Sequence, residues 1–154
     1  MSRPSVTVEQ QSWTMHLAES AREVFETMLG SSIELQGAMA SPTEVTAVVG
    51  LAGVLSGNFM VRCSQHGLQK MGECMLGGPV SPAEAIDAMG EVCNMLAGSW
   101  KRRIPELADG CMLSVPTVVI GSSYQVHSPD SQNLMEQRFA FGGEPVEIQL
   151  QVQK

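Results

Sequence analysis

The sequence predicts a two-layer α+β fold in which two long helices pack on a mostly antiparallel sheet. Two segments of about twenty residues have helical periodicity, Val8–Leu29 and Ser81–Arg103, and short segments of strand character come between and after them. The last of these, Val146–Val152, alternates apolar and polar residues, as expected of a strand with one buried face. Helices lying on that face would cover the apolar side of the sheet.

Length and composition agree with a single domain spanning residues 1–154. The chain is 44% hydrophobic and 16% charged, which excludes a disordered protein and leaves enough apolar residues for a real core. Nine Lys and Arg residues against sixteen Asp and Glu residues give a formal net charge of −7. This balance argues against nucleic acid or an anionic membrane surface as the main partner.

The cysteines and the hydropathy pattern favour a cytoplasmic protein. We expect no signal peptide and no membrane span, because the most apolar stretch, Ala47–Leu55, is short and interrupted by glycines. The four cysteines have neither CxxC nor Cys/His spacing and fit a reducing compartment, where they act as small apolar residues. They are Cys63, Cys74, Cys93 and Cys111.

The first helix carries start and stop signals. Thr7 and Gln10 are spaced as a capping box, and Gly30 is placed to end the helix. One apolar stripe recurs at spacings of three, four and seven residues. Its members are Trp13, Leu17, Val24 and Met28.

Strands are predicted next, followed by a shorter helix. The strand segments are Ile33–Ala38, Glu44–Ala52 and Asn58–Cys63. The glycine-containing link between the last two predicts a hairpin. A helix over Gln65–Leu76 should end at Gly77-Gly78-Pro79, a strong stop signal.

The second long helix has the clearest boundaries. Ser81-Pro82-Ala83-Glu84 combines a cap hydroxyl, a proline at the first helical position and a reciprocal glutamate. The basic residues Lys101-Arg102-Arg103 favour its C-terminal end.

Three strands are predicted after this helix. The first is Leu113–Gly121, with Pro116 at an edge or a bulge because proline cannot donate to a ladder. A loop around Ser128–Asp130 precedes the other two, Met135–Phe141 and Val146–Val152.

The two halves of the chain resemble each other at a constant offset of 68 residues. This offset aligns Glu23-Val24 with Glu91-Val92, Gly30 with Gly98 and Gly53 with Gly121. One helix-plus-strands unit used twice would explain these matches, and the domain would then be a pseudo-symmetric pair of halves. The competing explanation is that amphipathic helices before apolar strands resemble each other by composition alone.

The second long helix presents a polar strip opposite its apolar side. At 100° per residue, five residues fall within the strip: Asp87, Glu91, Asn94, Gly98 and Lys101. The opposite side holds Ile86, Met89, Cys93, Leu96, Trp100 and Ile104. A glycine within this strip would let another protein's backbone approach closely. The ordinary alternative is that the strip is simply a solvated face.

Two sequence blocks identify a family resemblance. Gly90-Glu91-Val92-Cys93-Asn94-Met95-Leu96-Ala97-Gly98, followed by Leu113-Ser114-Val115-Pro116-Thr117-Val118-Val119-Ile120-Gly121, closely resembles the CheX branch of the CheC/CheX/FliY phosphatases. These bacterial chemotaxis proteins dephosphorylate the response regulator CheY, and their signature is ExxN on a long exposed helix with a downstream LSxPTxxxG strand. The resemblance in element order covers nearly the whole chain and implies a CheC/CheX-like, pseudo-duplicated domain.

The resemblance assigns roles to two residues. Asn94 looks like the family's catalytic amide, which enters the regulator's active site and orients a water in line with the aspartyl phosphate. Glu91 looks like the acidic partner of a lysine beside that phosphate. Their three-residue spacing puts both side chains on one helical face. Asp87, Gly98 and Lys101 are expected to contribute to partner docking.

The same resemblance implies the cofactor and the partners. The regulator would supply the phosphoaspartate and the Mg²⁺, so no cofactor is expected in this chain. The partner is a CheY-like response regulator, and family members commonly form homodimers. The first helix departs from the pattern of doubly active relatives: Glu23 matches the glutamate of a second ExxN, but Glu26 stands where the asparagine would be needed. One active site per chain is therefore expected.

Other functions have weaker support. A non-catalytic binding or dimerisation module that kept the fold is the main alternative, and a small-ligand sensor at the seam between the halves is a weaker one. The three histidines, His16, His66 and His127, have no metal-ligand spacing. His127 and Asp130 lack the nucleophile elbow that a hydrolase triad would need.

Overall fold

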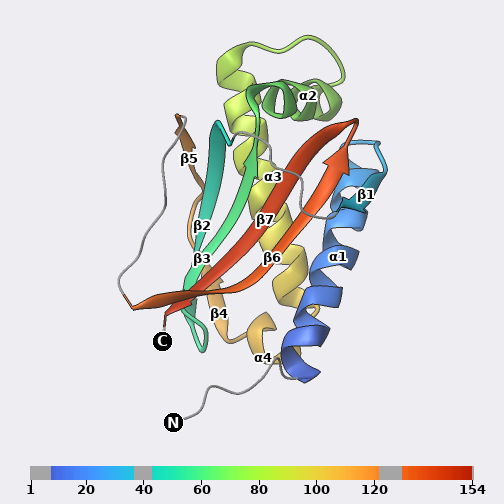
Figure 1. The fold of residues 1–154 in the computed structure, drawn as a ribbon. Helices are drawn as coiled ribbons and strands as arrows, with labels where there is room; N and C mark the ends of the chain where they lie inside the picture. Colours follow the sequence, from blue (N-terminus) through green and yellow to red (C-terminus); the bar gives the residue numbers. More distant parts are fainter. Residues whose placement is uncertain (1–7, 37–42, 122–129, 154) are drawn as a thin grey trace.

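A computed structural model describes residues 8–36, 43–121 and 130–153 (Figure 1). The helices are α1 Val8–Met28, α2 Gln65–Leu76, α3 Pro82–Arg102 and α4 Pro105–Ala108. The strands are β1 Ile33–Gln36, β2 Val45–Gly53, β3 Gly57–Cys63, β4 Cys111–Leu113, β5 Thr117–Ile120, β6 Ser131–Phe141 and β7 Glu144–Gln153. None of these helices combines the length and hydrophobicity that crossing a bilayer requires.

One sheet contains all the described strands. Their order is β1-β6-β7-β3-β2-β4, with β5 pairing the same edge of β2 as β4, and every described pair is antiparallel. The long helices α1 and α3 lie along one face of this sheet, and α2 lies across one end (Figure 1). The predicted α+β class with two long helices on an antiparallel sheet is confirmed.

The predicted helix boundaries are confirmed wherever the residues are described. Ser81 accepts a hydrogen bond from the backbone of Glu84 and Glu84 accepts one from the backbone of Ser81, which completes the capping box. Gly30 and Gly77 adopt the left-handed backbone that ends α1 and α2, with φ of 62° and 79°. The predicted cap at Thr7 lies outside the described residues.

The region after α3 differs from the prediction. The segment predicted as one strand over Leu113–Gly121 is two strands, β4 and β5, separated by residues 114–116. Pro116 has no backbone N–H and sits in this break at the sheet edge, as expected of it. The short helix α4 was not predicted, and β6 begins four residues earlier than expected, at Ser131.

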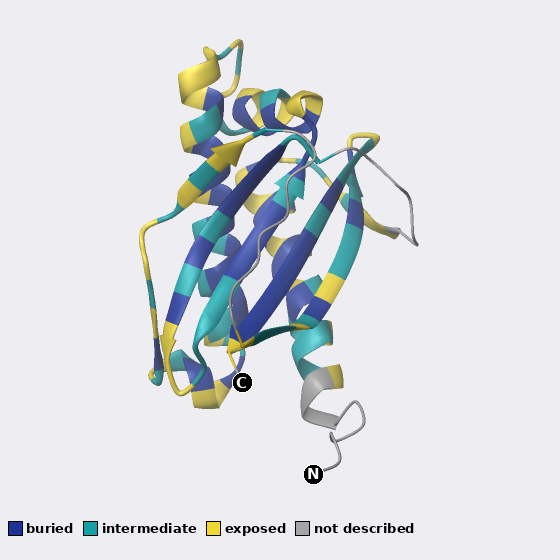
Figure 2. Ribbon diagram, turned by 60° about the vertical axis from the view of Figure 1, so that its left-hand side comes forward, coloured by how far each residue is buried: buried dark blue, intermediate teal, exposed yellow. Residues whose placement is uncertain are grey.

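The core lies between the sheet and the two long helices (Figure 2). Trp100 is fully buried there: its Nε1 donates to the carbonyl of Trp13 at 3.0 Å, and its ring packs against Trp13 and Phe59. Leu17 and Val24 are buried as predicted, but Met28 is 46% exposed. That part of the stripe prediction is wrong, because Met28 lies in the last turn of α1 and lines a groove rather than the core.

The strand order has the form of a repeated unit, but not at the predicted offset. β3 and β7 are neighbours at the centre, and β2 and β6 flank them. β1 lies at one edge, and β4 and β5, which both pair with β2, lie at the other. This order relates β2 to β6, whereas an offset of 68 would align β2 with residues 113–121 at the edge. Gly30 also ends α1 while Gly98 lies inside α3. The constant offset is therefore wrong within the sheet, where the two halves have different loop lengths.

Candidate functional site

The polar strip of α3 is open to solvent because the rest of that helix is committed to the core. Met89, Cys93, Leu96, Trp100 and Ile104 are at most 2% exposed, as the periodicity predicted, whereas Ile86 is half-buried. On the other side, Asp87 and Glu91 are exposed, and Asn94 and Gly98 are half-buried. The capping box and the buried face hold α3 in place, so the strip is presented on a rigid element.

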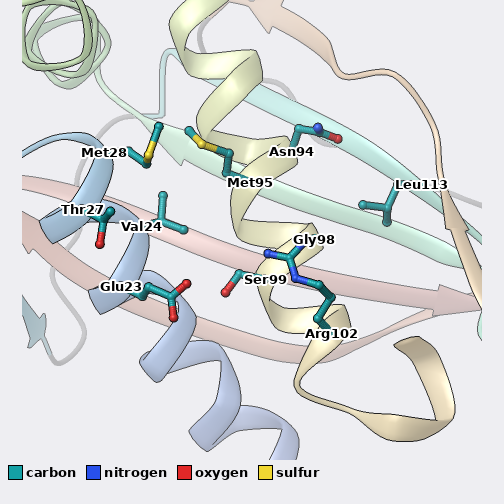
Figure 3. A pocket seen from close by; sticks show the side chains of 10 residues that line it. All are labelled: Glu23, Val24, Thr27, Met28, Asn94, Met95, Gly98, Ser99, Arg102 and Leu113. Carbon is teal, nitrogen blue, oxygen red and sulfur yellow. The ribbon is translucent and has the colours of Figure 1, made fainter. Parts of the chain in front are cut away.

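A shallow groove of about 340 Å³ runs beside this strip (Figure 3). It is lined by residues of α1, α3 and β4: Glu23, Val24, Thr27, Met28, Asn94, Met95, Gly98, Ser99, Arg102 and Leu113. Figure 3 shows the Asn94 amide pointing away from α1, toward the side on which Leu113 lies. The α3 strip therefore has α1 on one flank and β4 on the other.

Glu91 and Asn94 are available to a partner. Within residues 8–36, 43–121 and 130–153, neither side chain makes a hydrogen bond or an ion pair. Their spacing of three residues places them on one face of α3. A carboxylate and a neutral amide thus lie one turn apart on the solvent-facing side of α3, and no described residue bonds to either functional group.

The basic residues at the end of α3 have different environments. The Lys101 ammonium donates to the carbonyl of Ala108 at 2.5 Å, at the end of α4. Arg103 donates to the hydroxyl of Ser20 at 3.1 Å and forms an ion pair with Glu23. For Arg102, the described part of the chain provides neither a hydrogen bond nor an ion pair. Lys101, expected on the docking strip, is thus engaged by α4, and Arg102 is the cation that lines the groove.

The second sequence block, residues 113–121, connects α3 to the edge of the sheet on one side of the strip. The backbone N–H of Ser114 donates to the carbonyl of Gly50 at 2.9 Å, and the backbone N–H of Gly50 donates to the Ser114 hydroxyl at 2.8 Å. On the other side of this segment, Pro116 packs over Gly90, where an added Cβ would lie 3.4 Å from the proline Cγ. The segment 113–117 therefore links β2 to the helical turn that carries Glu91.

Sequence reasoning missed the functions of three of these residues. Gly90 and Ser114 stand in the quoted blocks, but only the structure shows that they join α3 to the sheet edge. Arg102 falls on the same helical face as Glu91 at 100° per residue, a signal that could have placed it on the strip.

The other candidate groups among the described residues do not form a second site. Burial raises the pKa of the Cys63 and Cys93 thiols to about 12, so both remain protonated core residues. His16 lies 3.2 Å from Glu19, and His66 lies 3.7 Å from Glu144. No group of three metal-ligating side chains occurs among the described residues. His127, one member of the rejected triad, lies outside them.

Comparison with known proteins identifies the family. The family described as "Chemotaxis phosphatase CheX" matches residues 45–140, more than half of the chain. The chain belongs to the CheX family. No curated protein matches the sequence significantly.

Solved structures agree on the fold of this CheX family member. It is similar to a chemotaxis protein CheX from Vibrio vulnificus, with a TM-score of 0.77 and 20% identity over 92% of this chain and 96% of that one. It is equally similar to the CheX of a CheX–CheY–BeF3–Mg²⁺ complex from Borrelia burgdorferi, with a TM-score of 0.77 and 16% identity, covering 92% and 98% of the two chains. FliY from Thermotoga maritima has a TM-score of 0.67 and 18% identity, covering 98% and 92%.

The contact between Gly90 and Pro116 generates a stability prediction. Gly90→Ala should be tolerated, and stabilising by up to about 1 kcal/mol, because its Cβ makes an ordinary contact and alanine favours the helix. Gly90→Leu should lower the free energy of unfolding by about 1–3 kcal/mol, because the larger side chain must displace Pro116. Urea denaturation of both variants measures the difference. Equal stability of the two variants would contradict the proposed packing.

Proposed function

We propose that this CheX family member is a phosphatase of a phosphorylated, CheY-like response regulator, acting through Glu91 and Asn94 of α3. The observation that carries the proposal is the geometry of these two residues. They lie one turn apart on the solvent side of a rigid helix, and no described residue uses their functional groups. Membership of the chemotaxis phosphatase family makes an aspartyl phosphate the fitting substrate.

In this mechanism Asn94 positions the attacking water. Its amide offers both a donor and an acceptor and brings no negative charge toward the phosphoryl group. The water oxygen bonds to phosphorus as the bond from phosphorus to the aspartate oxygen breaks, which yields inorganic phosphate and a free carboxylate. Because the transition state is loose, catalysis consists mainly of positioning and electrostatics, as in other phosphoryl-transfer enzymes.

Glu91 would act at the rim of the same site. An exposed carboxylate can pair with a lysine beside the phosphate, and it becomes desolvated as the helix docks. This pairing would place α3 so that Asn94 reaches the attacking water. The regulator would provide the Mg²⁺, so this chain would need no metal of its own.

The partner assignment has support from a relative. The Borrelia burgdorferi protein of similar fold was solved in complex with CheY, BeF3 and Mg²⁺. By extension, a CheY-like regulator is the partner proposed for this chain, which would act in the cytoplasm as a homodimer. The deciding experiment is a decay assay: regulators from the same genome are phosphorylated, and dephosphorylation is measured with and without this protein.

A second candidate function is a non-catalytic binding module that uses the same docking helix. The observation that keeps this candidate open is that Glu91 is exposed and pairs with no described residue, because a docking carboxylate on α3 would serve a binding module as well as an enzyme. Acceleration of phosphate loss decides between the two functions, because a binding module would capture the regulator without shortening the lifetime of its phosphate.

Asn94→Ala should abolish stimulated dephosphorylation and leave the fold intact, because the side chain lies on the open strip and makes no described contact within the chain. We expect a loss of rate on the order of 10²-fold or more. The matched control is Asn133→Ala, at an exposed asparagine of β6, which should keep the wild-type rate. Wild-type turnover by Asn94→Ala would show that the proposed mechanism is wrong.

Glu91→Ala and Glu91→Gln should weaken both docking and turnover, because either change removes the charge that pairs with the regulator's lysine. We expect the dissociation constant and the rate to worsen by about tenfold or more. Glu73→Ala removes one exposed acidic side chain from α2 and serves as the control for net charge. If a titration of the regulator gave unchanged affinity and rate for both Glu91 variants, Glu91 would be an ordinary surface residue.

We expect each chain to have one active site and to bind one regulator. Glu26 is an exposed carboxylate on α1 and would repel a phosphoryl group where a second site would need an amide. Glu26→Ala should therefore keep phosphatase activity within about twofold of wild type. Calorimetry should give one regulator per chain. A ratio of two would assign a working site to α1 as well.

A further inference from the structure

We propose that Arg102 is a docking residue that binds a carboxylate on the regulator's surface, beside the phosphoryl site rather than in it. This inference rests on the proposed function and extends it to partner recognition. It starts from the three consecutive basic residues at the end of α3. Lys101 and Arg103 are engaged by Ala108, Ser20 and Glu23, whereas Arg102 is exposed and has no polar partner in the described part of the chain.

The position of the guanidinium is the first supporting observation. A Cβ added at Gly98 would lie 3.3 Å from Arg102 Nη1, so the exposed arginine folds back along α3 over Gly98. Arg102, Gly98 and Asn94 all line the same groove (Figure 3). The cation is therefore held on the face that carries Asn94.

The absence of a side chain at position 98 is the second observation. A glycine inside a helix lowers stability relative to alanine, and Gly98 lies within the 21 residues of α3. On its other side, the added Cβ would lie 3.9 Å from Leu113 Cδ1. The missing side chain at Gly98 thus leaves the room beside α3 in which the guanidinium lies, which is a structural reason for a glycine at this position.

The distance to Asn94 determines the kind of ligand. Gly98 is four residues from Asn94, which corresponds to about 6 Å along the helix. A guanidinium over Gly98 lies about one turn along α3 from the residue that orients the water, so we expect it to meet a group beside the phosphate. A carboxylate fits, because the planar guanidinium can donate two parallel hydrogen bonds to it. Glu23, the acidic residue among those that line the groove, is already paired with Arg103 and leaves Arg102 to a partner.

The experiment compares four variants: Arg102→Ala, Arg102→Lys, Gly98→Ala and the double variant Gly98→Ala/Arg102→Ala. Arg22→Ala, at an exposed arginine of α1 outside the groove, controls for net charge. Two quantities are measured: the Kd for a regulator activated with beryllofluoride and Mg²⁺, and KM and kcat for dephosphorylation. The Kd does not depend on hydrolysis, so it reports on docking even if the chain binds without catalysing.

Arg102→Ala should raise Kd and KM on the order of tenfold and leave kcat within about twofold. Arg102→Lys should recover part of the loss, and high salt should reduce the difference from wild type. Gly98→Ala should also raise Kd, because it displaces the guanidinium. If the glycine acts through Arg102, the double variant should be no worse than Arg102→Ala alone.

Four results would overturn the inference or a part of it. Unchanged Kd and KM in Arg102→Ala would exclude docking, and a lower kcat at unchanged KM would place Arg102 at the phosphoryl group instead. A full additional effect of Gly98→Ala in the Arg102→Ala background would show that the partner touches the glycine directly. If the wild-type protein bound the regulator without hydrolysing its phosphate, the proposed phosphatase activity would be refuted. The Kd values of the variants would still test the docking role of Arg102. Failure to bind any activated regulator would refute both.

Discussion

The burial of Trp100 is the constraint on which the site depends. This side chain is fully buried where α3 meets α1 and β3; it packs edge-to-face with Trp13 and tilted against Phe59, and its indole N–H donates to the Trp13 carbonyl. A tryptophan that satisfies packing and its N–H at once has one acceptable orientation. The rotation of α3 about its own axis is thereby set. Since one residue corresponds to 100° of rotation, Glu91 and Asn94 can reach a partner only in this orientation.

Much of α3 and its strip was predictable because the signals are local. The capping box at Ser81 and Glu84 depends on residues three positions apart, and the apolar side repeats with the period of the helix. The hairpin between β2 and β3 and the stop at Gly77 depend on glycines at the turn itself. For the site, periodicity identified the open face, whereas the roles of Glu91 and Asn94 came from resemblance to a family and not from spacing.

The remaining features depend on residues far apart in the chain, which periodicity does not reveal. The break between β4 and β5 is fastened by hydrogen bonds between Ser114 and Gly50, 64 residues apart. Lys101 was expected on the strip because its angle is right, but the unpredicted helix α4 brings the Ala108 carbonyl within reach of it. The predicted offset of 68 residues between the two halves is wrong for a similar reason. The positions of β2 and β6 in the sheet show that these strands correspond, and their distance in the sequence does not reveal it.

A fold with two equivalent long helices can carry a single working face because the halves use their acidic residues differently. On α1, Glu23 pairs with Arg103, which follows the last turn of α3, and Arg103 also donates to Ser20. An exposed ion pair contributes at most about 1 kcal/mol, so this pair adds a little to the core packing that holds the two helices together. On α3, Glu91 has no such partner among the described residues, and a neutral amide follows it one turn later. Glu23 of α1 therefore adds to the contact between the two helices, whereas Glu91 of α3 remains available to another protein.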